Sequence, residues 1–186
     1  DWDFQPEIDD NHVHKIGNRM RALHQKGMPE GLSIVRNSRF NPVPEHVHDY
    51  VEISYVYCGN APQIVNGAQL TLAQNEVLLL DAACPHAIGE LGEHDIMLSI
   101  VISRPMLRRS LDQSLSSAGT VSRFLLNALN DETDHRGHVH FRTGGSRRVR
   151  RYMQEMLCEL LEPTAASPQI ASRLFELLLV ELMQSY

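Results

Sequence analysis

A succession of short, apolar, β-like segments between Gly31 and Ser103 is the feature that most constrains the fold of this chain. The segments follow one another at roughly the 8 to 12 residue spacing of an antiparallel sandwich or barrel. They are LSIVRNS, YVEISYVYC, PQIV, QLTLA, EVLLLDA, HAIGEL and DIMLSIVIS. Asn66 and Gly67 lie between two short β-like runs and form a strong hairpin signal. We therefore expect a mainly β region in which the runs beside Asn66-Gly67 pair with each other.

After Arg104 the hydrophobic period changes to that of helices. Residues 146–162 carry apolar side chains at helical spacing, namely Val149, Tyr152, Met153, Met156, Leu157, Leu160 and Leu161. Ser146 is placed to cap the N-terminus of this helix, and Pro163 follows its end. A second helix is expected from about Pro168 to the end of the chain, with proline near its first turn. Residues 177–180 make this helix apolar around most of its circumference.

The two helices are expected to form an antiparallel pair. A dimer contact and a purely intrachain core would both cover the second helix on more than one side. For a dimer, we expect the interface to contain Met153, Leu157, Leu160, Leu161, Leu174 and Leu178. Residues 104–115 and 120–130 predict two shorter helices, and residues 138–143 predict a brief strand.

Length and charge exclude some classes of protein. A chain of 186 residues suits one large domain, or one domain with an appended subdomain. The net charge is −6, and the acidic excess lies in residues 1–103, so the chain is not typical of a nucleic-acid-binding surface. Residues 146–151 contain four arginines at the start of an amphipathic helix, which we interpret as a solvated face rather than a phosphate contact.

The cysteines and the N-terminus bear on location. Cys58, Cys84 and Cys158 lack the paired spacing of a disulfide framework or a zinc site, which favours a reducing cytoplasm. No segment approaches the roughly 18 apolar residues of a membrane span, and the acidic first ten residues differ from a signal peptide, so no membrane association is expected. The first residue is not Met, which indicates a fragment of a longer protein.

The triplet His-Val-His occurs three times, and one copy is followed by acidic and aromatic side chains at strand spacing. In an extended strand His46, His48, Tyr50 and Glu52 would share one face. With His86 from another strand, His46, His48 and Glu52 would form an open N3O site suited to Fe(II), Mn(II), Ni(II) or Zn(II). Without an ion, the same histidines and Glu52 would hydrogen-bond to one another or to a ligand hydroxyl.

The other copies give weaker signals. His12 to His14 lacks a later carboxylate on the same face, and His138 to His140 lies beside Asp134 and His135 in a turn-like stretch. We expect surface or structural roles for these two copies. Cys84, close to His86, would serve either as a soft metal ligand or as a small buried hydrophobe, and the second role is commoner.

The spacing His46-x-His48, three residues, Glu52, six residues, Gly59 resembles the first conserved cupin motif, and His86 stands at the histidine of the second. The positions of ligand type match. Those of turn type depart from the motifs, where the expected Gly, Gly, Pro, Gly and Asn are here Phe40, Asn75, Asp81, Ala83 and Glu90. The resemblance covers roughly residues 32–103 and implies a cupin-like double-stranded β-helix, or jelly-roll, barrel.

The flanking sequences narrow the resemblance. Several stretches are similar to the N-terminal sensor domain of AraC/XylS-type transcription regulators. They are HVHDYVEISYVYCG, the hairpin with VNG, LAQNEVLLLDAACPHAI, FLLNAL, and HFRTG before SRRVRRYMQEMLCEL. This resemblance implies an effector-binding barrel, dimerising helices, and a C-terminal DNA-binding domain with two helix-turn-helix units beyond Tyr186. It divides the chain into an N-terminal arm or lid (1–30), the barrel (31–103) and a helical dimerisation subdomain (104–186).

Two functions follow from these observations. The first is a non-enzymatic sensor that binds a small polar effector such as a sugar at His46, His48, Tyr50, Glu52 and His86, without needing a cofactor, and dimerises with a second copy. DNA would be contacted only through the C-terminal domain. The alternative is a metal-dependent cupin enzyme, such as a dioxygenase or isomerase, with a divalent metal (Zn, Ni, Mn or Fe) at His46, His48, Glu52 and His86.

Overall fold

The computed structural model describes residues 7–8, 14–16, 25–112, 120–130 and 134–185. The strands are β1 (Glu7–Ile8), β2 (His14–Ile16), β3 (Leu32–Arg36), β4 (Val43–His48), β5 (Val51–Cys58), β6 (Asn60–Val65), β7 (Ala68–Ala73), β8 (Val77–Leu80), β9 (His86–Ile88), β10 (Ile96–Ile102) and β11 (His138–Phe141). The helices are α1 (Arg104–Asp112), α2 (Thr120–Asn127), α3 (Arg147–Leu161) and α4 (Ser167–Gln184). Among these helices, none is long and apolar enough to cross a membrane.

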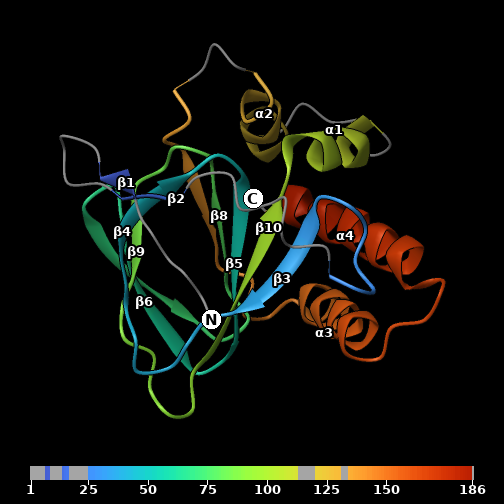
Figure 1. Cartoon of the computed structure of the whole chain (residues 1–186), viewed down its shortest axis with the longest axis horizontal. Helices are drawn as coiled ribbons and strands as arrows, with labels where there is room; N and C mark the ends of the chain where they lie inside the picture. Colours follow the sequence, from blue (N-terminus) through green and yellow to red (C-terminus); the bar gives the residue numbers. More distant parts are fainter. Residues whose placement is uncertain (1–6, 9–13, 17–24, 113–119, 131–133, 186) are drawn as a thin grey trace.

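The strands form two sheets that face each other (Figure 1). Within the described ranges, one sheet has the order β1-β2-β4-β9-β6-β7 and the other the order β11-β8-β5-β10-β3. Neighbouring strands are antiparallel except β2 and β4, which are parallel. The side chains between the sheets include Val56, Val65, Leu72, Leu78, Leu80, Ile88 and Met97. The expected mainly β, barrel-like fold with a helical tail is therefore confirmed.

The five-stranded sheet is buried on both faces. In β8, Leu78 and Leu80 point into the space between the sheets, whereas Val77 and Leu79 point toward the helices. Successive side chains of a strand alternate between its faces, so a strand covered on both sides is apolar at consecutive positions. This explains the uninterrupted run of residues 77–80.

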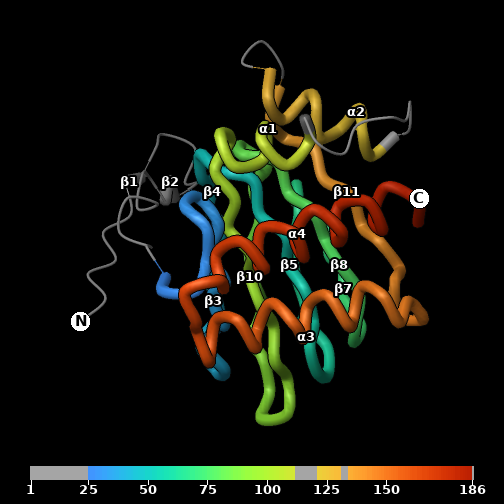
Figure 2. Tube along the Cα trace, turned by 90° about the vertical axis from the view of Figure 1, so that its right-hand side faces the viewer, coloured from blue at the N-terminus to red at the C-terminus, as the bar shows by residue number. Residues whose placement is uncertain are grey.

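Helices α3 and α4 run antiparallel to each other across the outer face of the five-stranded sheet (Figure 2). Their side chains Val149, Met153 and Phe175 join the outward side chains of the sheet in one core. Ser146 Oγ accepts a hydrogen bond from the backbone N–H of Val149 at 3.2 Å, as an N-cap residue does. The predicted helix pair and its N-cap are confirmed.

Three strands of the two sheets lie outside the barrel boundaries expected from the sequence. β11 lies in the region assigned to the helical subdomain, yet it pairs with β8 and forms one edge of the five-stranded sheet. β1 and β2 lie in the expected N-terminal arm, yet β1 pairs with β2 and β2 pairs with β4. The expected boundaries at residues 30 and 103 therefore do not coincide with the edges of the sheets. Apart from β1 and β2, the arm before residue 25 is outside the described residues.

Two of the expected dimer residues need correction. Met153 and Leu178 have no exposed surface, because they pack in the core between the helices and the five-stranded sheet. Leu157, Leu160 and Leu174 are partly buried against the same core. Leu161 is 76% exposed. The sequence pattern indicated that apolar side chains on several sides of these helices must be buried. Within this chain, the five-stranded sheet buries many of them.

Left-handed backbone conformations occur at positions where the turns require them. Asn66 and Gly67 both have positive φ angles, +50° and +76°, and connect β6 to β7 as the expected hairpin. Phe40 and Asn75, which replace glycines of the cupin motifs, also have positive φ, +61° and +65°. The chain has thus kept these turns without the glycines that the motifs lead one to expect.

Gly59 occupies the turn between β5 and β6 with φ of +74°, and a Cβ there would lie 1.9 Å from Asp95 Oδ1. That carboxylate is held in place, because its two oxygens accept from the backbone N–H groups of Asn60 and Gly92 at 2.9 and 2.8 Å. Gly59 is therefore constrained both by its dihedral angle and by its neighbour.

We predict that Gly59→Ala lowers the free energy of unfolding by at least about 1 kcal/mol more than Gly67→Ala does. Both substitutions place a Cβ at positive φ, which destabilises by roughly 1–2 kcal/mol. At Gly67 no atom lies within 4 Å of the added Cβ, so that variant isolates the dihedral contribution. Urea denaturation of the two variants measures the difference, and equal losses would contradict this account of Gly59.

Candidate ligand-binding site

Four of the five predicted ligand-binding residues are buried, and their side chains gather between the two sheets. His46 and His48 come from β4, His86 from β9 and Glu52 from β5. β4 and β9 are paired, with His46 opposite His86. Glu52 lies in the other sheet, opposite Leu80 on β8. Strands from both sheets therefore supply the cluster.

The expectation of one continuous strand from His46 to Glu52 was wrong. β4 ends at His48, the chain bends at Asp49 and Tyr50, and β5 begins at Val51 in the opposite sheet. The bend brings Glu52 back toward His48, with Glu52 Oε2 3.5 Å from His48 Nε2. The two residues thus meet across the barrel interior rather than along one strand.

Backbone carbonyls orient two of the rings. His46 Nδ1 donates to the carbonyl oxygen of Pro44 at 2.8 Å, and His86 Nδ1 donates to that of Cys84 at 3.0 Å. A neutral imidazole that donates from Nδ1 has an electron pair at Nε2. His86 Nε2 is buried and has no hydrogen-bond partner within the described part of the chain. Burial lowers the pKa of His86 to about 3, so its ring is neutral at physiological pH.

Glu52 is a buried carboxylate held by polar neighbours. Ser54 Oγ donates to Glu52 Oε1 at 3.2 Å. Burial raises the pKa of Glu52, but the contact with His48 and the other polar neighbours outweighs it, and the pKa lies below its usual range. Glu52 therefore stays ionised and can only accept hydrogen bonds or bind a cation.

The ring of His48 is covered by that of Tyr50, and neither of its nitrogens makes a hydrogen bond within the described ranges. The two rings stack with their centroids 3.9 Å apart and an interplanar angle of 11°. Both ring nitrogens of His48 are buried without a hydrogen-bond partner among the residues described here. A buried polar atom without a partner is unfavourable, so His48 is suited to meet a bound species.

The donor set fits a divalent transition metal at three of the four predicted ligands. Donor atoms of His48, Glu52 and His86 all lie within 4.8 Å of one another. Donors about 2.0–2.2 Å from one ion are at most about 4.4 Å apart, so the side chains need to close by only a few tenths of an ångström. His46 is outside this group of three, and its ring packs against His86 with the centroids 4.1 Å apart.

The structure adds polar residues that the sequence analysis did not select. Gln63 on β6 is buried, and its Oε1 has no partner in the described ranges. It faces the barrel interior, because it lies two residues from Val65, the partner of His86 in the β6–β9 pair. Ser54 could have been found by alternation from Glu52. Gln63 could not, because its place depends on which strands pair.

The described residues of the other two histidine triplets lie on β2 and β11. His140 Nε2 is 2.9 Å from Glu76 Oε2, and His138 Nδ1 is 3.4 Å from the side-chain nitrogen of Asn66. His14 stands opposite His46 in the β2–β4 pair, and His12 is outside the described residues. Cys84 is fully buried among apolar side chains, and burial raises the pKa of its thiol to about 12.

The surface also has a hollow beside the six-stranded sheet and a group of arginines on α3. A hollow of about 400 Å³ is lined by residues of β4, β6, β7 and β9, including Gln63 and Ile88, and none of the five predicted residues lines it. The four arginines at the start of α3 are exposed, as expected for a solvated face. Arg148 contacts Glu181 at 3.4 Å and Arg151 contacts Glu155 at 3.9 Å.

The model of the AraC-like ligand binding domain matches residues 35–181. The match includes β4 to β11, the histidine cluster and most of α4. The chain therefore belongs to the AraC-like ligand-binding domain family. Among curated proteins, none matches the chain.

Solved structures of ToxT from Vibrio cholerae share the fold. Apo ToxT K231A superposes with a TM-score of 0.52 at 15% identity, over 78% of this chain and 52% of that one. ToxT bound to (E)-4-(8-methylnaphthalen-1-yl)but-3-enoic acid gives a TM-score of 0.51 at 13% identity, over 83% of this chain and 57% of that one. The chain spans about half the length of the ToxT structures that it matches.

Proposed function

We propose that this chain is the small-molecule-sensing and dimerisation domain of an AraC-type transcription regulator. Effector binding in the barrel controls a C-terminal helix-turn-helix domain, which makes the DNA contacts. The observation that carries the proposal is a group of buried polar atoms at His48, His86 and Gln63, inside a barrel of the ligand-binding family, that have no hydrogen-bond partner among the described residues. Free cysteines at positions 58, 84 and 158 support a reducing cytoplasm as its location.

The hydrogen-bonding character of the site supports an effector rich in donors, such as a sugar or another polyol. Glu52 only accepts, and His86 Nε2 and Gln63 Oε1 also accept. A carboxylic acid, like the ligand in the ToxT complex, would bring further acceptors and a negative charge toward Glu52. Hydroxyl groups would instead satisfy these atoms without burying an unpaired charge.

A metal-bound form is the second candidate, carried by the group His48, Glu52 and His86. Two neutral imidazoles and one carboxylate are ligands that Zn(II), Ni(II), Mn(II) and Fe(II) accept. An ion bound there would supply a Lewis acid with open positions, as a metal-dependent cupin enzyme requires. The carbonyl of Cys84 would fix the orientation of His86 toward it.

A homodimer is supported by apolar side chains that remain exposed on the helix pair. Leu161 ends α3, and Ile170 and Leu177 lie two turns apart on one face of α4, with exposures of 76%, 41% and 47%. Helix α3 also has Arg in its first turns, Glu155 and Glu159 in its second half, and Glu162 as its C-cap. Two copies of α3 packed antiparallel would place opposite charges together.

We predict that a polyol effector raises the melting temperature of the wild-type chain by about 5–10 °C at one hundred times its dissociation constant, because binding then stabilises by about 2.7 kcal/mol. Glu52→Gln should abolish this rise in melting temperature. Glu76→Gln is the matched control, because it makes the same change at the residue just before β8, and it should preserve the rise. A thermal-shift screen of sugars, polyols and carboxylic acids measures this. The proposed effector class would be refuted if only carboxylic acids raised the melting temperature and they still did so in the Glu52→Gln variant.

For the metal-bound form, we expect about one divalent ion per chain in protein purified without chelators. His48→Ala and Glu52→Gln should each weaken binding at least about tenfold, because each removes a ligand. His140→Ala is the matched control, since His140 pairs with Glu76 outside the cluster. Elemental analysis and competition with a chromogenic chelator measure the ion. No stoichiometric metal in the wild-type chain would reject this form and the enzymatic alternative together.

For the dimer, we expect Leu177→Glu to raise the dimer dissociation constant at least about tenfold, because a charge would be buried against apolar surface. Leu126→Glu on α2 is the control, since Leu126 has a similar exposure of 48%. Sedimentation velocity over a concentration series measures association. A monomeric wild-type chain at micromolar concentration, or equal effects of both variants, would contradict the proposed interface.

A further inference from the structure

The loop between β8 and β9, residues 81–85, holds two histidines of the site through its backbone. The carbonyl oxygen of Ala82 accepts from the backbone N–H of His48 at 3.2 Å. The carbonyl oxygen of Cys84 accepts from His86 Nδ1 at 3.0 Å. The position of this β8–β9 loop therefore sets where His48 and His86 lie.

The loop is itself fixed at its first residue, Asp81, which is almost fully buried. Asp81 Oδ1 accepts from the backbone N–H of Ala82 at 2.7 Å, and Oδ2 lies 3.1 Å from His135 Nδ1. The carbonyl oxygen of His135 accepts from the backbone N–H of Ala83 at 2.8 Å. The segment before β11 thus holds the loop by a side chain and by its backbone.

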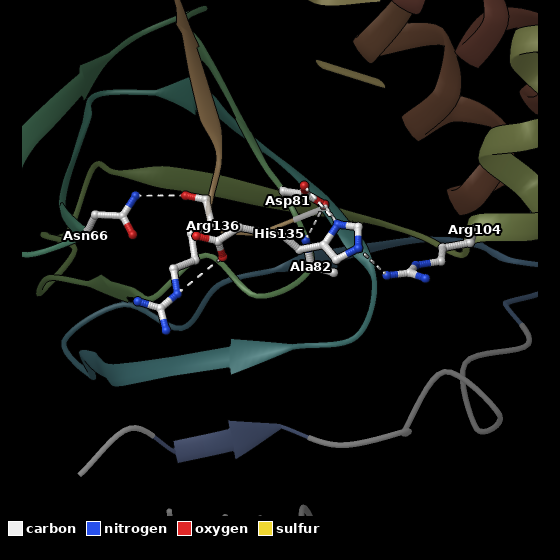
Figure 3. Close-up of polar contacts among 7 residues, drawn as sticks. Asn66, Asp81, Ala82, Arg104, His135 and Arg136 are labelled. Atoms are coloured by element: carbon white, nitrogen blue, oxygen red, sulfur yellow. Dashed lines mark hydrogen bonds and ion pairs between the residues drawn. The ribbon is translucent and has the colours of Figure 1, made fainter. Parts of the chain in front are cut away.

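The second ring nitrogen of His135 reaches helix α1. His135 Nε2 lies 3.1 Å from Nη2 of Arg104, the first residue of α1 (Figure 3). A guanidinium group can only donate, so Nε2 accepts, and the ring proton is on Nδ1 and is donated to Asp81. The hydrogen bonds therefore run in one direction, from Arg104 through a neutral His135 to the Asp81 carboxylate.

Helix α1 connects this chain of bonds to the helical layer. It follows β10 directly, and its side chains Met106, Leu107 and Leu111 are buried in the core that the helices share. α1 packs against α4, which carries the exposed Ile170 and Leu177. A displacement of α1 is therefore felt by the helix that bears the proposed dimer surface.

We infer that Asp81, His135 and Arg104 form a positioning relay that couples the histidine site to helix α1. The inference deepens the proposed sensor function, on which it rests. A bound species that shifts the β8–β9 loop changes the Asp81 to His135 contact and, through it, the hold of His135 on Arg104. By linkage, the factor by which binding at the site favours one position of α1 is also the factor by which that position of α1 raises the affinity of the site. Occupancy shifts the relay only as far as the bound species favours one arrangement over the other.

The first test measures the ring of His135 in the unaltered chain. Two-dimensional ¹⁵N NMR of the imidazole nitrogens should show the neutral tautomer with the proton on Nδ1 and a bare Nε2. An Nε2 proton on this ring at neutral pH would overturn the relay, because Arg104 would then face a second donor.

The second test measures coupling by hydrogen exchange of α1, residues 104–112. In the wild-type background, His86→Ala should accelerate exchange there about fivefold or more, because the loop loses one of its two bonds to the site. In the His135→Ala background, the same substitution should add less than about twofold. Two substitutions at separated sites without shared partners have additive effects. A smaller effect of His86→Ala in the His135→Ala background therefore shows that His86 and α1 are coupled through His135.

Two further variants serve as matched controls. His135→Gln should restore the response to His86→Ala, because its amide can donate to Asp81 and accept from Arg104. His140→Ala should leave the response unchanged, since His140 is bonded to Glu76 outside the relay.

Equal acceleration in the wild-type and His135→Ala backgrounds, or none in the wild type, would overturn the relay. Because the tautomer is read in the unaltered chain, a variant that fails to fold does not remove the test. Neither measurement uses an effector. A negative result for the relay would not count against effector binding in the barrel, and a failed effector screen would not count against the relay.

Discussion

The strands at the centre of the five-stranded sheet must bury both faces, one toward the opposite sheet and one toward α3 and α4. In β5 this requirement sends Val51, Ile53 and Tyr55 to the helices and Glu52, Ser54 and Val56 to the interior. The apolar half of the strand binds the two layers together. Because the apolar side chains of β5 face the helices, its polar side chains face the space between the two sheets. The packing of the helices on this sheet therefore determines where the site lies.

A carboxylate in such a place is tolerated only with partners, because the desolvation of an unpaired charge is far more unfavourable than that of a neutral group. Glu52 has Ser54 and His48 nearby, and the histidines are turned by the carbonyls of Pro44 and Cys84. Within the part of the chain that the structure describes, no donor reaches His86 Nε2 or Gln63 Oε1. The interior is thus arranged for one more component, and its chemistry is complementary to hydroxyl groups or a cation.

Much of the fold could be predicted from local patterns, because they report on the nearest surroundings of each residue. The helices, the Ser146 cap of α3, the Asn66-Gly67 hairpin and the inward set on β5 all follow from periodicity and turn chemistry. The bend at Asp49 and Tyr50 was missed, because a strand that changes sheets keeps its apolar alternation across the bend. Gln63, and the burial of Met153 and Leu178, depend on which elements meet across the fold, and no local pattern contains that information.

The parallel pairing of β2 with β4 gives the N-terminal region a role in the integrity of the site. β4 carries His46 and His48, and it has β9 on one side and β2 on the other. A chain shortened to begin after Ile16 would leave β4 as a sheet edge, with a row of backbone N–H and C=O groups open to pairing with another molecule. The strand that brings the histidines to the barrel would then also be open to edge-to-edge aggregation.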